Sequence, residues 1–208
     1  MIFTEIQKAI RRCINTANVD SSRTQSLIKH IEKLGANNVN LLFVCTHNSR
    51  RSQFAQVWAK VAASYFDINI QTYSGGTEVT AVYPSVIKSL REAGFVIRVD
   101  ARDTEAEVDN PFYKVYYSYD FPPIELYSKL AEDALPKTEQ ALAIMTCNDA
   151  EENCPVITNV TQRIPLSYID PKMHDGTHVE IERYAKTSCQ IATEMLHVFS
   201  KISELVYK

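Results

Sequence analysis

The first 38 residues carry a helical pattern of their own. Apolar residues recur at helical spacing in two stretches: Ile2, Ile6, Ile10 and Ile14, then Leu27, Ile28, Ile31 and Leu34. A polar break before Ser21 and Ser22 separates the stretches, and Gly35 is typical of a helix end. The pattern predicts a helical hairpin, an N-terminal appendage over 1–38. We expect it to pack on the main domain as a cap, or to contact a second copy or another protein.

The main domain, 39–208, alternates between short apolar runs and amphipathic stretches. Strand-like runs lie at 39–44, 68–73, 95–99 and 141–146, with a short fifth candidate at 163–166. Helical spacing covers 53–66, 83–93 and 179–206, and Ser74, Gly75 and Gly76 are expected to end the second strand. Strands that alternate with helices predict an α/β fold with a parallel sheet covered on both faces.

A tyrosine-rich insert at about 108–140 interrupts this alternation. It contains Phe112, Tyr113, Tyr116, Tyr117, Tyr119, Phe121 and Tyr127, with prolines at positions 111, 122, 123 and 136. A segment of this length is either a structural flap over the surface or a lid that shapes a binding pocket.

Composition and charge argue against a nucleic-acid-binding, membrane or secreted protein. Lys and Arg number 22 against 25 Asp and Glu, so the net charge of −3 does not favour a nucleic-acid partner. No apolar run approaches the roughly 20 residues of a membrane helix, and the charged N-terminus does not resemble a secretion signal. The five cysteines, an odd number, point to a reducing compartment, the cytoplasm, without structural disulfides. Cys13 and Cys189 lie on apolar helical stripes and are expected in the core.

A polar loop between the first strand and its helix has the composition of an anion cradle, or P-loop. It begins at Cys45, continues through Thr46, His47, Asn48, Ser49 and Arg50, and ends at Arg51 and Ser52. Inward backbone N–H groups and the helix N-terminus would bind an oxyanion and favour a nucleophilic thiolate at Cys45. Arg51 supplies a planar fork for two oxyanion oxygens, and the Ser52 hydroxyl can donate to the sulfur. Asn48 tolerates the positive φ that such a loop needs.

This loop resembles that of the low-molecular-weight tyrosine phosphatases, a superfamily that includes the thioredoxin-coupled arsenate reductases. The resemblance covers roughly 39–202 without the insert. It implies a four-stranded parallel sheet flanked by helices. It also implies a general acid in an Asp-Pro pair near the C-terminus, which matches Asp170 and Pro171. The catalytic residues expected from it are Cys45, Arg51, Ser52 and Asp170.

A second cysteine motif, Cys147 to Cys154 followed by Pro155, resembles the redox segment of those reductases. In that family the first of the two cysteines attacks the arsenic adduct and the second closes a disulfide with it. On an intact helix the two would stand about 10 Å apart, beyond the roughly 7 Å that a disulfide allows. The pair therefore either bonds after the segment unwinds or stays as two unlinked buried cysteines. Four zinc ligands at suitable spacing are not visible.

The sequence departs from the family pattern at several positions. His47 replaces a glycine of the loop, and Arg50 replaces a frequent second cysteine and is expected to add positive charge near the mouth. The potassium site of some reductases would map to Asn48, Ser74 and Asp103, but its acidic residue is Gln56 here, which puts that cation in doubt. No tightly bound cofactor is expected, and no histidine is given a metal role.

Three functions fit these motifs. The main hypothesis is an oxidoreductase that reduces arsenate through Cys45, Cys147 and Cys154, with thioredoxin as reductant. The alternative is a hydrolase, a phosphatase that acts on phosphotyrosine or small phosphomonoesters through a phosphocysteine at Cys45. A third is an oxyanion or redox sensor without turnover, against which the intact loop and Asp170 argue. Neither oligomeric state nor the purpose of the insert follows from the sequence.

Overall fold

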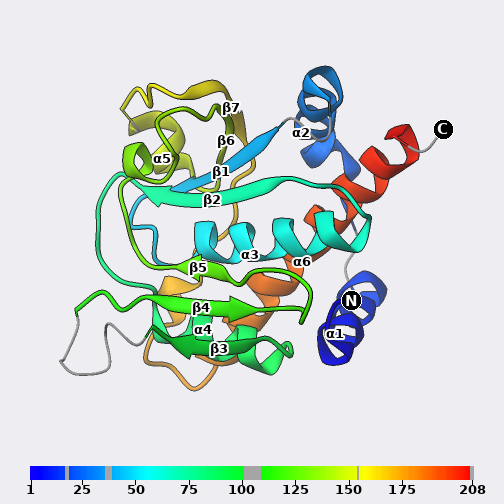
Figure 1. Cartoon of the computed structure of the whole chain (residues 1–208). Helices are drawn as coiled ribbons and strands as arrows, with labels where there is room; N and C mark the ends of the chain where they lie inside the picture. Colours follow the sequence, from blue (N-terminus) through cyan, green and yellow to red (C-terminus); the bar gives the residue numbers. More distant parts are fainter. Residues whose placement is uncertain (17–18, 36–38, 101–108, 154, 207–208) are drawn as a thin grey trace.

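The computed structural model describes residues 1–16, 19–35, 39–100, 109–153 and 155–206. Its main sheet has four strands in the order β2-β1-β6-β7, all parallel (Figure 1). The strands are β1 (Asn40–Cys45), β2 (Gln71–Gly76), β6 (Ala141–Met145) and β7 (Val160–Pro165). This arrangement confirms the expected α/β fold with a four-stranded parallel sheet flanked by helices.

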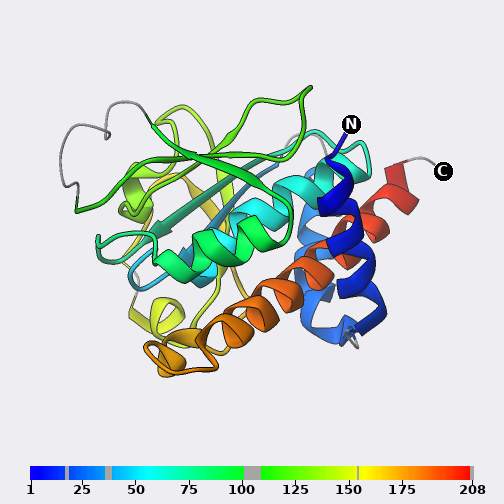
Figure 2. The ribbon, with the colours of Figure 1, turned by 90° about the horizontal axis from the view of Figure 1, so that it is seen from below.

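Helices cover the central strand on both faces, as its apolar run requires. The longer ones are α3 (Arg51–Tyr65), α4 (Pro84–Glu92) and α6 (Glu180–Val206), and the short ones are α5 (Asn148–Asn153), η3 (Ala131–Asp133) and η4 (Pro171–His174). Leu41 and Phe43 of β1 join the large apolar cluster under α3 and α6, whereas Leu42, Val44 and Cys45 join a smaller one beside α5. Figure 2 shows α3, α4 and α6 running on one side. No helix in the described part of the chain could cross a membrane.

Glycines extend the second strand further than the sequence predicts. We expected 68–73 with Gly75 and Gly76 beyond its end, but β2 includes both, paired with Val44 and Cys45 of β1. A Cβ on Gly75 would lie 2.4 Å from the Ala131 Cα, and one on Gly76 would lie 2.6 Å from the Thr46 carbonyl oxygen. The glycines are therefore required by close backbone approach at the end of the sheet, and they do not mark a turn.

The expectation that 95–99 belongs to the parallel sheet is wrong. β3 (Val96–Val99) instead forms a separate antiparallel sheet with two strands of the insert, β4 (Tyr113–Tyr116) and β5 (Ile124–Leu126). Val96 and Val99 are exposed and only Ile97 between them is buried, the pattern of a sheet with one wet face. The insert is thus a structural flap that supplies buried side chains such as Tyr117.

The two N-terminal helices, α1 (Thr4–Thr16) and α2 (Ser21–Leu34), both pack on α6. Ile6 and Ile10 of α1 and Leu27 and Ile31 of α2 are fully or almost fully buried. Asp20 caps α2 by accepting a hydrogen bond from the Ser22 N–H, and Gly35 ends it at a φ of 83°. Both predicted apolar stripes are therefore largely covered within this chain, although Ile14 and Leu34, the last residue of each, are exposed.

A disulfide contradicts one expectation from the cysteine count. Cys13 of α1 and Cys189 of α6, expected as unlinked core residues, are joined with their Cα atoms 5.3 Å apart. The sequence missed the pair because 176 positions separate the two cysteines and neither belongs to a recognisable disulfide motif. The bond ties the N-terminal appendage covalently to the longest helix.

This bond should contribute measurably to stability. Reduction is expected to lower the free energy of unfolding by about 2–4 kcal/mol, because it restores conformational freedom to a long loop in the unfolded chain. Urea unfolding with and without reductant measures the change. The Cys13→Ala variant is the control and should lose this response to reductant. An equal response in wild type and variant would show that another pair of thiols is responsible.

Candidate active site

Cys45 lies at the bottom of the loop that connects β1 to α3. Its side chain is buried, and its Sγ lies 3.0 Å from the Ser52 Oγ. Asn48 has a φ of 45°, which confirms its expected conformation, and its Nδ2 donates to the same Ser52 oxygen over 2.9 Å. Since that oxygen accepts from Asn48, the Ser52 hydroxyl proton is available for the sulfur. The Asn48 Oδ1 accepts from the Lys129 N–H, which fixes the loop to the insert.

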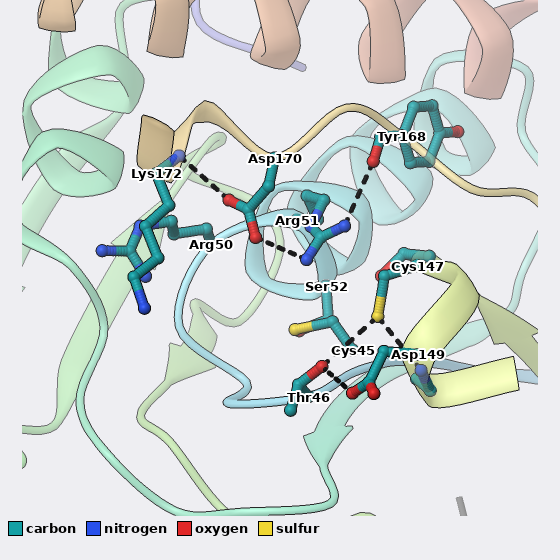
Figure 3. A network of polar contacts seen from close by, with 12 residues as sticks. Cys45, Thr46, Arg50, Arg51, Ser52, Cys147, Asp149, Tyr168, Asp170 and Lys172 are labelled. Carbon is teal, nitrogen blue, oxygen red and sulfur yellow. Dashed lines mark hydrogen bonds and ion pairs between the residues drawn. The ribbon is translucent and has the colours of Figure 1, made fainter. Parts of the chain in front are cut away.

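Arg51 points toward the same loop with one of its donors unused. Its Nη2 donates to the Asp170 Oδ2 over 2.5 Å, and its Nη1 donates to the Tyr168 carbonyl over 3.1 Å (Figure 3). Its Nε is one of few buried side-chain atoms without a hydrogen-bond partner among the described residues. A buried N–H without an acceptor is costly, and an oxyanion in the loop would satisfy it.

Asp170 stands where a general acid is expected. It caps η4, where its Oδ1 accepts from the Lys172 N–H over 3.0 Å, while its Oδ2 pairs with Arg51. The structure thus brings the predicted residues Cys45, Arg51, Ser52 and Asp170 into one site. An oxyanion that enters the loop would compete with Asp170 for the Arg51 guanidinium.

The N-terminal appendage supports the segment that carries Asp170. Arg23 of α2 donates through Nη2 to the Ser167 carbonyl over 2.8 Å and pairs through Nε with Glu194 of α6 at 2.8 Å. Tyr168, the next residue, is buried. The Arg23 guanidinium carbon lies over its ring, 5.6 Å from the ring centre. Sequence reasoning missed Arg23, since 144 positions separate it from Ser167 and no local motif marks it.

Arg50 does not add positive charge at the mouth, as the sequence suggested. Its Nε donates to the Tyr184 hydroxyl over 2.5 Å and its Nη2 pairs with Asp175 at 2.5 Å. Its guanidinium also stacks on Tyr83, 4.1 Å from the ring centre. Asp175 therefore neutralises the charge, and Arg50 connects the cysteine loop to the start of α4, to the loop after η4 and to α6.

Cys147 lies two residues beyond the end of β6, which pairs with the strand that ends at Cys45, and α5 starts directly after it. Its side chain is buried, with the Sγ 3.6 Å from the Thr46 Oγ1 and 3.4 Å from the Ala150 N. It shares with Arg51 a surface pocket of about 420 Å³, which is also lined by Asn148, Asp149, Ser167, Tyr168 and Ile169. Cys154 lies outside the described residues.

The residues considered for potassium are engaged within the protein. Ser74 donates to the Gln56 Oε1 over 2.6 Å, and Asn48 uses both amide atoms as described above. Asp103 lies outside the described residues, so the expectation about potassium stays a prediction. Among the described residues, no group of three or more His, Cys, Asp and Glu side chains could hold a metal. His47 pairs instead with Glu78 at 3.3 Å.

Lys129 places its ammonium group in a largely buried position next to the loop. Its Nζ donates to the Tyr127 carbonyl over 3.2 Å and lies 4.0 Å from the centre of the Tyr127 ring. Burial disfavours the charged form and lowers the pKa of Lys129 from 10.5 to about 8. The lysine is therefore expected to cost stability at neutral pH, where the buried group is charged.

We expect the Lys129→Met variant to be more stable than wild type at pH 7. Its free energy of unfolding, measured by urea denaturation, should be higher by about 1–3 kcal/mol. The unfolded lysine keeps its proton up to about pH 10.5, whereas the folded one loses it above about pH 8. Wild-type stability should therefore rise between these pH values, and the advantage of the variant should shrink there. Lys137→Met, which removes an exposed lysine, is the control. A destabilised Lys129→Met protein at pH 7 would contradict the argument.

Sequence comparison identifies arsenate reductases as relatives of this chain. No model of a known protein family matches the chain. It is 28% identical to an arsenate reductase of Bacillus licheniformis over 140 residues, 67% of this chain and 79% of that protein. It is 26% identical to an arsenate reductase of Oceanobacillus iheyensis over 165 residues, 79% of this chain and 96% of that protein.

Among solved structures, the chain resembles an arsenate reductase from Archaeoglobus fulgidus. The TM-score is 0.50 at 17% sequence identity, with 77% of this chain and 98% of that chain covered. At this identity the likeness shows a shared fold alone. Together with the sequence relatives, it confirms the resemblance that the two cysteine motifs predicted.

Proposed function

We propose that this chain reduces arsenate to arsenite at Cys45, with Cys147 and Cys154 carrying the electrons. One observation carries the proposal: Cys147 is buried at the rim of the Cys45 loop and shares a pocket with Arg51. Hydrolysis of a phosphocysteine needs no second thiol there, whereas reduction of an oxyanion does. Relatives at 26–28% identity that are arsenate reductases support the same conclusion.

The first step follows from the geometry of the loop. Arsenate occupies the cradle, where backbone N–H groups and the unused Nε of Arg51 bind its oxygens. The Cys45 thiolate attacks arsenic, and Asp170 protonates the oxygen that leaves as water. The Ser52 hydroxyl, 3.0 Å from the Cys45 sulfur, stabilises the thiolate before attack.

The second step transfers two electrons to arsenic. The Cys147 sulfur attacks the Cys45 sulfur, a disulfide forms between them, and the sulfur–arsenic bond breaks with its electron pair remaining on arsenic as arsenite. Cys154 then attacks Cys147 and releases Cys45. A dithiol reductant, which we propose to be thioredoxin, reduces the resulting Cys147–Cys154 disulfide by thiol–disulfide exchange.

Arsenate-dependent oxidation of NADPH in the presence of thioredoxin and thioredoxin reductase tests the proposal. We expect multiple turnovers that stop when thioredoxin is omitted. A fully reduced, folded protein that shows no turnover would contradict the reductase function. Hydrolysis of p-nitrophenyl phosphate, measured in parallel, shows whether the Cys45 loop is chemically competent.

A phosphatase would use the same Cys45, Arg51 and Asp170, but the structure removes one argument for it. As a lid that shapes a binding pocket, the insert could supply tyrosines as the walls of a phosphotyrosine slot. Tyr127 instead stacks on Phe112 at 3.9 Å between ring centres, and Tyr117 is fully buried. Among the described residues of the insert, none lines the pocket beside Cys147 and Arg51.

A further inference from the structure

The segment that carries Asp170 is held from two opposite sides. The Tyr168 N–H donates to the Thr146 carbonyl, just beyond the end of β6, over 3.1 Å. From the other side, the Arg23 Nη2 of α2 donates to the Ser167 carbonyl over 2.8 Å. The C=O and N–H of one trans peptide point in opposite directions, so these two bonds hold the 167–168 peptide between them. Asp170 lies two residues further on, and the position of its carboxyl group depends on this peptide.

Arg23 is itself fixed by a buried carboxylate of the longest helix, α6. Its Nε pairs with the Glu194 Oε1 at 2.8 Å, and the Glu194 side chain is buried. Its guanidinium carbon also lies 5.6 Å from the centre of the Tyr168 ring. The Glu194 Oε2 and the Tyr168 hydroxyl are buried without a hydrogen-bond partner among the described residues. Arg23 thus supplies the cation that a buried Glu194 requires, and it holds the Tyr168 ring and the preceding carbonyl at the same time.

This anchor matters most once an oxyanion has bound. In the structure, Arg51 donates to the Asp170 carboxylate and to the Tyr168 carbonyl (Figure 3). An oxyanion in the Cys45 loop would compete for the same guanidinium. The bond between Arg51 and Asp170 would then weaken at the step in which Asp170 must deliver a proton to a defined atom. The bonding partners of Arg23 lie outside the loop, so its hold on the segment would persist.

We propose that Arg23 is a positioning residue for the general acid Asp170, which makes the N-terminal appendage part of the catalytic unit. The inference rests on the proposed function, in which the Asp170 proton goes to the oxygen that leaves arsenate as water. Arg23 acts through the Ser167 carbonyl and the Tyr168 ring. It belongs to α2, which precedes the range 39–202 of the phosphatase-like resemblance, so that resemblance implies no such residue.

A double variant removes the contact without leaving a buried charge. Arg23→Met alone would leave the Glu194 carboxylate buried without its cation and would destabilise the protein, so it is combined with Glu194→Met. Ile10→Ala is the matched control, because it removes a buried side chain of α1 and keeps every contact of Arg23. Urea unfolding gives the temperature range in which both proteins are folded, and the rates are measured there.

The dependence of the rate on the leaving group reports on the general acid. A well-placed acid makes kcat/KM nearly insensitive to the basicity of the departing oxygen, because it supplies the proton which that oxygen needs. We expect the double variant to lose about 10-fold or more in kcat/KM for phenyl phosphate. The loss for p-nitrophenyl phosphate, whose leaving group is far less basic, should stay below about 3-fold. The value for arsenate should fall as it does for phenyl phosphate.

The ratio of the two aryl phosphate values separates positioning from general loosening. Ile10→Ala should keep the wild-type ratio even where its rates are lower. The same ratio in the double variant as in Ile10→Ala would overturn the role of Arg23. A wild type that hydrolyses both aryl phosphates but forms no arsenite would show that the proposed function has failed, and the ratio would still decide on Arg23.

A wild type that hydrolyses neither substrate calls for a binding measurement. Inorganic phosphate should protect Cys45 from iodoacetamide, which peptide mapping follows, and the Tyr168 carbonyl next to the Arg23 contact also holds Arg51. The double variant should need about 3-fold more phosphate than Ile10→Ala for half protection, the effect of one weakened hydrogen bond. Equal concentrations would overturn the inference. Phosphate that protects neither wild type nor variant would remove the oxyanion site, and the role of Arg23 with it.

Discussion

The Arg51→Lys variant is expected to lose about a thousandfold in kcat/KM for arsenate, equivalent to about 4 kcal/mol of transition-state stabilisation. The guanidinium offers a planar fork, and its Nε is buried without a partner among the described residues. A lysine keeps the charge but cannot bind two oxyanion oxygens in one plane. Initial rates with arsenate and with p-nitrophenyl phosphate should fall together, because both substrates use the same loop.

The neighbouring arginine provides the contrast. Arg50 bonds to Tyr184 and Asp175 and stacks on Tyr83, so Arg50→Lys should mainly lower the free energy of unfolding, by about 1–2 kcal/mol. Its effect on kcat/KM should be far smaller than that of Arg51→Lys. A loss of kcat/KM of equal size in the two variants would contradict a specific role for the fork geometry of Arg51, since both substitutions keep the positive charge.

The sequence predicted the fold where its signals were local. The buried run of β1, the helical spacing of α3 and the glycine at position 35 each determine a nearby element. The antiparallel sheet was missed because β3 pairs with strands of the insert, and an exposed Val96 looks the same in an apolar run as a buried one. The Cys13–Cys189 disulfide was missed for a related reason, since only the folded chain brings the two helices together.

The candidate site was predictable to the extent that its residues share a motif. Cys45, Arg51 and Ser52 lie within one loop, and Asp170 precedes a proline that marks it. The direction of a side chain does not follow from such a motif: Arg50 turns toward Tyr184, and Thr46 turns toward Cys147. Arg23 supports the Asp170 segment across the fold, which no spacing along the chain reveals.

The second prediction with a large effect concerns Cys154. In the Cys154→Ser variant, arsenite formation is expected to stop after about one equivalent per protein molecule, because Cys147 can still attack Cys45 and release arsenite, but nothing then resolves the Cys45–Cys147 disulfide. The steady-state rate with thioredoxin should fall by at least about 100-fold, as expected when a nucleophile of the cycle is removed. Quenched-flow measurement of arsenite and peptide mapping of the Cys45–Cys147 disulfide give the two readouts.

A matched variant separates this effect from loss of any cysteine. Cys13→Ala removes a thiol that bonds only to Cys189 and lies in the N-terminal appendage, so it should keep multiple turnover at temperatures where the protein stays folded. A Cys154→Ser protein with the full steady-state rate would contradict the three-cysteine relay, since Cys147 would then be regenerated without Cys154. A burst of one equivalent shows instead that Cys147 and Cys154 act in sequence. It also separates this chain from a phosphatase, in which neither cysteine has a role in turnover.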